Sequence, residues 1–185
     1  MATIVLERSH SAPVALSDIV SAYATTQPGV VPLVHAAAPE GLLSISIFHA
    51  AEAEAVRSLS TALPSSRLEI WPATTNRDDG VAAFRTSVIK AGPGALALVD
   101  KRFPVPVEIG VPANNFDPED WCLNMHRVRY LHSHLAPDRC RMVCLYAAAD
   151  VETVVSAYRL IPVEVARIFR VAIDPALEFD GCRTV

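Results

Sequence analysis

Two histidines and two cysteines lie close together in one stretch of the chain, LHSHLAPDRCRMVCLY. His132 and His134 are two residues apart, so both rings would project from the same side of a β-strand. Cys140 and Cys144 follow shortly after them. Imidazole and thiolate groups ligate Zn, Ni and Cu, and imidazole also transfers protons near neutral pH. The stretch is therefore the first candidate for a functional site.

The stretch predicts a β-hairpin, and the position of its turn decides which side chains share a face. With a turn through residues 135–139, His134 lies opposite Cys140 and His132 opposite Met142. This pairing gathers seven polar or sulfur-containing side chains on one face. They are Tyr130, His132, His134, Cys140, Met142, Cys144 and Tyr146.

Three interpretations of this face remain open. In the first, a small molecule binds there, with Tyr130, His132 and His134 as catalytic groups and Cys140, Met142, Cys144 and Tyr146 lining the pocket. In the second, a divalent transition metal (Ni, Zn or Cu) is bound by His132, His134 and Cys140. In the third, these side chains only pack, because Cys and Met are common in protein cores.

The hairpin belongs to a longer unit that occurs twice in the chain. A shift of 98 positions, the separation of Pro39 and Pro137, aligns the chain with itself without a gap as far as Trp71 and Phe169. The alignment keeps apolar, acidic and proline positions in register over a strand, a helix and a second strand. Such agreement indicates an internal duplication.

Each copy follows the order β-α-β-β-α-β of a ferredoxin-like unit. We therefore predict an α+β fold, in which tandem ferredoxin-like (βαββαβ) repeats stack their two sheets to form a pseudo-dimeric α+β barrel. The predicted boundaries are 1–76 for repeat 1, 77–94 for a linker, 95–175 for repeat 2 and 176–185 for a loosely ordered tail. A short extra strand is expected at residues 84–89, inside the linker.

Alternation along the strands predicts the direction of the side chains. Ile45 and Ile47 are expected under the helices, as are their equivalents Val143 and Leu145, which leaves the His and Cys face for the barrel interior.

Two acidic residues, Glu7 and Asp100, end equivalent strands and are followed by Arg8 and Lys101. We expect ion pairs with these neighbours, and a role at the end of the barrel is the alternative.

Composition excludes several classes of protein. The chain has 185 residues, 51% of them hydrophobic and 19% charged, which favours a globular fold with a substantial core. A net charge of −4 and dispersed Lys and Arg residues argue against nucleic-acid binding. No apolar run reaches the roughly 18 residues of a membrane span, and no signal sequence is evident. We expect a cytoplasmic protein with reduced cysteines.

The sequence contains no GxGxxG, P-loop, HExxH, GxSxG or CxxC motif, so no nucleotide cofactor is expected. We predict a small-molecule-binding barrel, with proton-transfer chemistry of the isomerase or cyclase type as its possible activity. The alternative is a nickel-like transition-metal-binding protein. The expected partners are a small molecule or a metal ion, with self-association into a homo-oligomer as a further option.

Several short motifs also carry a resemblance to a known family. They are the opening VLERS, a strand that ends in His-Ser, the VCLY strand after a turn, and the A-x-D-x-E-x-V pattern that opens a helix. With these motifs the chain resembles small bacterial ferredoxin-like proteins described as nickel-binding-protein-like domains. The resemblance implies a barrel of two such units and a nickel ligand at His132. The long first helix of that family is shortened and broken by prolines in the second copy.

Overall fold

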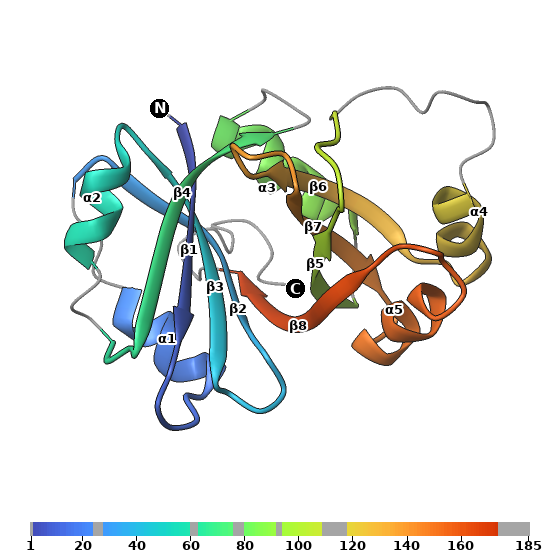
Figure 1. Ribbon diagram of the computed structural model, residues 1–185, viewed down its shortest axis with the longest axis horizontal. Coiled ribbons are helices and arrows are strands. Elements are labelled where there is room, and N and C mark those ends of the chain that lie inside the picture. The colour runs from blue at the N-terminus through green and yellow to red at the C-terminus, as the bar shows by residue number, and fades with distance from the viewer. Residues whose placement is uncertain are drawn as a thin grey trace, which may run out of the picture.

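The computed structural model describes residues 2–23, 28–59, 63–75, 80–91, 94–108 and 118–173, which hold eight strands and five helices (Figure 1). The strands are β1 (Ala2–Ser9), β2 (Val30–Ala37), β3 (Leu43–Ala50), β4 (Arg67–Thr75), β5 (Ala95–Arg102), β6 (Arg129–Leu135), β7 (Arg141–Ala148) and β8 (Val165–Ile173). The helices are α1 (Leu16–Tyr23), α2 (Ala53–Ser58), α3 (Gly80–Ala91), α4 (Pro118–Met125) and α5 (Val151–Tyr158). The predicted tail, 176–185, lies outside the described residues.

The eight strands join into one closed antiparallel barrel. Their order around it is β1-β3-β2-β8-β5-β7-β6-β4, and β4 pairs again with β1. The predicted fold class, tandem ferredoxin-like repeats that stack two sheets as a pseudo-dimeric α+β barrel, is therefore wrong. That prediction left the sheet edges unpaired, whereas β2 pairs with β8 and β4 pairs with β6. Closure is favoured because an open edge leaves backbone N–H and C=O groups without partners.

The two junctions between the halves differ in length over the residues that the structure describes. Strands β2 and β8 pair over four positions. Over the described residues, which on the β4 side end at Thr75, strands β4 and β6 pair at two positions, Thr74 with Leu135 and Thr75 with His134. Every other pair of neighbouring strands is joined over five to eight positions within the described residues.

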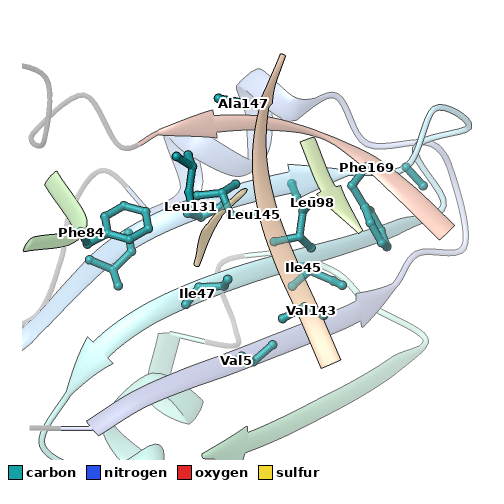
Figure 2. Close-up of a cluster of buried hydrophobic side chains, with 14 residues drawn as sticks. Val5, Ile45, Ile47, Phe84, Leu98, Leu131, Val143, Leu145, Ala147 and Phe169 are labelled. Atoms are coloured by element: carbon teal, nitrogen blue, oxygen red, sulfur yellow. The ribbon is translucent and has the colours of Figure 1, made fainter. Parts of the chain in front are cut away.

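Buried side chains form three clusters, one inside the barrel and two beneath helices. The interior cluster combines residues of seven strands with Phe84 of α3, and Figure 2 shows its members meeting between the strands. A second cluster includes Ile19 and Val56 and lies beneath α1 and α2. The third includes Leu123 and Val154 and lies beneath α4 and α5. Figure 1 shows these two helix pairs on opposite sides of the molecule.

The predicted direction of the side chains is wrong in both halves. Ile45, Ile47, Val143 and Leu145 were expected under the helices, but all four lie in the interior cluster. Their strand neighbours, such as Phe48, pack beneath the helices instead. Alternation assigns residues to two faces, but both faces are buried here, so apolar content alone does not show which face points inward.

Helix α3 occupies the predicted linker, and the short strand expected at residues 84–89 is wrong. Val81, Phe84, Val88 and Ala91 recur at three- and four-residue spacing, so they share one face of a helix. Phe84 is buried in the interior cluster and the other three pack against it. No helix among the described residues is long and apolar enough to span a membrane.

Candidate functional site

The hairpin formed by β6 and β7 has a different register from the predicted one. His134 lies opposite Val143, and His132 lies opposite Leu145. The turn is tighter than expected, because the Ala136 N–H bonds the Arg141 carbonyl and Arg139 adopts a left-handed φ of 62°. Relative to the predicted pairing, His134 is paired three residues further along β7, with Val143 in place of Cys140. Because side chains alternate between the faces of a strand, this odd shift places the two histidines and Cys144 on opposite faces.

The predicted set of seven side chains is therefore divided between the two faces of the sheet. His132 and His134 share their face with Val143 and Leu145 of the interior cluster. Four of the others pack in the cluster beneath α4 and α5, and they are Tyr130, Met142, Cys144 and Tyr146. Cys140 is half-buried in the turn. Among the described residues, no group of three or more His, Cys, Asp or Glu side chains could hold a metal ion.

The aromatic residues of the predicted site form their own network beneath α5. The Tyr158 hydroxyl donates to the Tyr146 hydroxyl at 2.6 Å. The Lys101 ammonium lies over both rings, 5.7 Å from the centre of the Tyr146 ring and 5.3 Å from that of Tyr158. Tyr130 donates to Ser133 at 2.8 Å. These contacts position a buried cation against aromatic faces, an arrangement that stabilises the packing of α5.

The histidine pair is buried inside the barrel. His134 is 2% exposed, and neither of its ring nitrogens has a hydrogen-bond partner in the described part of the chain. Burial lowers the pKa of His134 to about 3, and repulsion from His132 adds to this effect. The two rings are nearly parallel, with centroids 6.5 Å apart. His134 is therefore neutral at physiological pH.

A cluster of charged side chains inside the barrel centres on Arg141, at the start of β7. Arg141 is 5% exposed and donates to both oxygens of Asp100, each at 2.9 Å. It also pairs with Glu7 of β1 and lies 3.9 Å from Glu69 of β4. Its guanidinium carbon is 5.8 Å from the centre of the Trp71 ring. We call Glu7, Glu69, Asp100 and Arg141 the charged cluster.

The charged cluster is electrostatically favourable despite its burial. Burial acts to lower the pKa of Arg141, but hydrogen bonds and ion pairs with Asp100 and then Glu7 outweigh it and raise that pKa. The planar guanidinium matches the two Asp100 oxygens, which is the strongest geometry for such a pair. Arg141 therefore keeps its positive charge, and its contacts join β1, β4, β5 and β7 across the barrel.

A cavity of about 280 Å³ opens beside the charged cluster. It lies where β1 and β5 end and β4 begins, and its lining is entirely polar: Glu7, Ser9, Arg67, Glu69 and Arg102. Arg67 pairs with Glu69, and Arg102 lies 3.6 Å from Asp100. The volume is near the lower end of ligand pockets, which run from roughly 300 to 1,000 Å³. The cavity can thus hold a small molecule between carboxylates and guanidiniums.

Sequence reasoning identified part of this site. Glu7 and Asp100 were considered because they end equivalent strands, but both pair with Arg141 rather than with Arg8 and Lys101. Arg8 turns toward α1 and α2, where it bonds the Leu63 carbonyl at 2.7 Å. Arg141 was missed, although a lone Arg in an otherwise apolar strand is a signal of a buried ion pair.

Comparison with known proteins finds solved structures with a similar fold. No family model matches the chain, and no curated protein matches it in sequence. The crystal structure of a protein named "putative chlorite dismutase" superposes with a TM-score of 0.50 at 10% identity, covering 97% of this chain and 99% of that one. A "putative monooxygenase" from Lactobacillus acidophilus gives a TM-score of 0.43 at 9% identity, covering 94% and 95%. The first likeness shows the fold alone, and it agrees with a barrel that uses the whole chain.

Proposed function

We propose that this chain binds a small polar molecule in the cavity beside the charged cluster. The observation that carries the proposal is the cavity itself, whose walls bring the carboxylates of Glu7 and Glu69 next to the guanidiniums of Arg67 and Arg102. In the described part of the chain the Arg102 guanidinium makes one long contact, to Asp100, which leaves N–H groups for a ligand oxygen. A molecule with an anionic or carbonyl oxygen suits these donors.

The same lining favours proton transfer as the chemistry of the site. Glu69 is 38% exposed at the cavity wall, so its carboxylate can accept a proton from a bound molecule. Arg102, on the same wall, stabilises the negative charge that such a step leaves on a ligand oxygen. In this step a proton moves from a ligand carbon next to a carbonyl to the Glu69 carboxylate, and Glu69 then returns it to the ligand.

A binding experiment tests the site. A panel of small carboxylic and oxo acids is titrated into ¹⁵N-labelled protein, and amide shifts are followed by NMR. We expect shifts at residues around Ser9 and Glu69, and at least tenfold weaker binding in Arg102→Met, because a charge-assisted contact is lost. The matched control is Arg170→Met, since Arg170 pairs with Glu152 on the surface. Equal binding by the two variants would remove the proposal.

A second experiment tests the chemistry separately. Exchange of the α-hydrogens of the best-binding oxo acid is measured by ¹H NMR in D₂O. Wild-type protein should accelerate this exchange, and Glu69→Gln should reduce it about a hundredfold while the ligand still binds. Binding without exchange would leave a binding protein and exclude proton transfer.

Transition-metal binding, expected from His132, His134 and Cys140 and from the resemblance to nickel-binding-like domains, stays a prediction. Elemental mass spectrometry of untagged protein tests it, with His132→Ala and His134→Ala as the variants. The catalytic roles expected of Tyr130, His132 and His134 also stay predictions, and none of the three lines the cavity.

A further inference from the structure

The inner end of the cavity beside the charged cluster holds more carboxylates than cations. Glu7 lines the cavity, and Arg141 and Asp100 lie behind it. The two carboxylates share the single guanidinium of Arg141, which donates to both Asp100 oxygens at 2.9 Å and pairs with Glu7. At their formal charges, these three residues have one surplus negative charge. We call Glu7, Asp100 and Arg141 the cavity floor.

Two nearby cations point away from the cavity floor. Arg8 and Lys101 directly follow Glu7 and Asp100 in the chain, so their side chains project from the opposite face of the sheet. Arg8 bonds a backbone carbonyl of the segment after α2. Lys101 lies over two tyrosine rings beneath α5. Neither cation therefore compensates the surplus negative charge on the inner side of the barrel.

The outer part of the cavity has the opposite balance of charge. Its charged residues are Arg67, Arg102 and Glu69, and Glu69 pairs with Arg67. Each of the three is at least 38% exposed, compared with 15% for Glu7, so they lie nearer the solvent. Two guanidiniums and one carboxylate leave one surplus positive charge. We call Arg67, Glu69 and Arg102 the cavity rim.

We propose that the cavity binds a small amino acid, with its ammonium group against Glu7 and its carboxylate group against Arg67 and Arg102. Such a ligand brings a positive charge to the floor and a negative charge to the rim, whereas a plain carboxylic acid compensates the rim alone. The volume of about 280 Å³ restricts the ligand to a small molecule. This inference rests on the proposed binding of a small polar molecule, and it leaves the role of Glu69 unchanged.

The ammonium group should contribute more at the floor than in a contact on the surface. Glu7 is largely shielded from water, and the attraction between opposite charges strengthens as solvent screening falls. A carboxylate accepts several hydrogen bonds, so an ammonium group can bond Glu7 while Arg141 stays paired with it. The amino acid therefore gains a charge-assisted hydrogen bond that the matching acid lacks.

Matched ligands test the ammonium group in the unmodified protein. The pairs are glycine and acetate, β-alanine and propionate, and 4-aminobutyrate and butyrate, which vary the spacing between the two charged groups. Each ligand is titrated into ¹⁵N-labelled protein, and amide shifts around Ser9 and Glu69 are followed by NMR. In at least one pair the amino acid should bind about fivefold tighter than the acid, or more.

The possible failures of this titration are distinguishable. A ratio below about fivefold in every pair would overturn the inference and leave the proposed binding of acids in place. Absence of shifts with all six ligands would also overturn it. If the oxo acids produced no shifts either, the proposed function would fail as well.

A variant assigns the ammonium group to Glu7. Glu7→Gln keeps the shape of the side chain and an oxygen for Arg141 but removes the negative charge, so the tighter binding of the amino acid should disappear. The control, Glu152→Gln, removes an exposed carboxylate on α5 and should keep the tighter binding. Its persistence in folded Glu7→Gln would overturn the proposal.

A crystal structure with the tightest-binding amino acid gives the same assignment without a variant, should Glu7→Gln fold poorly. The ligand nitrogen is expected within hydrogen-bond distance of a Glu7 oxygen. A nitrogen bound elsewhere would overturn the proposal.

Discussion

The barrel interior holds two sets of buried ionisable side chains that are satisfied very differently. Arg141 is bonded to both oxygens of Asp100 and paired with Glu7, so its charge is compensated on two sides. His134 lies on β6 opposite Val143, which follows Arg141 by two residues on β7. Neither ring nitrogen of His134 has a hydrogen-bond partner in the described residues. The comparison shows that the same barrel interior stabilises the positive charge of Arg141, which has carboxylate partners, and disfavours a positive charge on His134, which has none in the described residues.

This difference assigns the two sets to different roles. The charged cluster fixes four strands relative to one another and forms one wall of a polar cavity. His134 makes no hydrogen bond in the described residues, and its lowered pKa makes the stability of the protein depend on pH. Four predictions test the contrast, starting with the largest effect.

Removal of the central cation should be the most damaging change. Arg141→Met leaves Asp100 and Glu7 buried without their partner, and breaking a buried pair in this way costs about 3–5 kcal/mol of unfolding free energy. Urea denaturation measures the loss. Arg170→Met, on an exposed pair, should stay within about 0.5 kcal/mol of wild type. A loss below about 1 kcal/mol for Arg141→Met would show that the cluster does not stabilise the barrel.

Acid should destabilise the protein through the histidine pair. The pKa of His134 is lowered to about 3 in the folded protein, against about 6.5 when unfolded. The unfolded state therefore binds more protons between these values. Stability contributed by the neutral ring is complete above pH 6.5 and is lost toward pH 3, by up to about 1.4 kcal/mol per pH unit. Urea titrations from pH 7.5 to 4.5 should show this slope in wild type and a smaller one in His134→Gln.

At neutral pH, replacement of His134 should have a small effect. Leucine is similar in size and carries no polar atoms that need partners, so His134→Leu should change the unfolding free energy by less than about 1.5 kcal/mol. Chemical denaturation at pH 7.5 measures it beside Arg141→Met. A loss of 3 kcal/mol or more would mean that the imidazole makes a stabilising bond, and the contrast between the two sets would fail.

A helix cap on the surface provides the smallest expected effect. Asp150 caps α5 by accepting from the Thr153 N–H at 2.7 Å, and hydrogen bonds from Thr153 lower the pKa of its exposed carboxyl. Asp150→Ala should lower the midpoint of urea denaturation at pH 7.5 slightly, because the Thr153 N–H loses its acceptor. It should leave the slope of stability against pH between pH 7.5 and 4.5 unchanged, which separates local helix stability from the effect of the buried histidine.

Local features of the structure could be predicted from the sequence. Ile45 and Ile47 were expected on a strand, which is β3, and the helix expected at the A-x-D-x-E-x-V pattern is α5, capped by Asp150. Both predictions rest on alternation and capping, which involve neighbouring residues. The strand expected at 84–89 failed because Phe84 and Val88 are equally compatible with a helical stripe, and packing on the barrel decided between them.

Non-local features could not be predicted in the same way. Closure through β2–β8 and β4–β6 joins residues far apart in the chain, and no local signal marks such pairs. The site depended on the β6–β7 register, which the left-handed Arg139 sets and which moved the histidines away from Cys144 and Tyr146. The charged cluster joins Glu7, Asp100 and Arg141 across the barrel, so only the folded chain brings them together.

A crystal structure of the protein soaked with the tightest-binding oxo acid would test the central claim most directly. The account predicts that the ligand occupies the cavity, with its oxygen atoms bonded to Arg102 or Arg67 and a carbon next to its carbonyl facing Glu69. Ligand density beside His132 and Ser87, or in the aromatic network of Tyr146 and Tyr158, with the charged cavity empty, would contradict it.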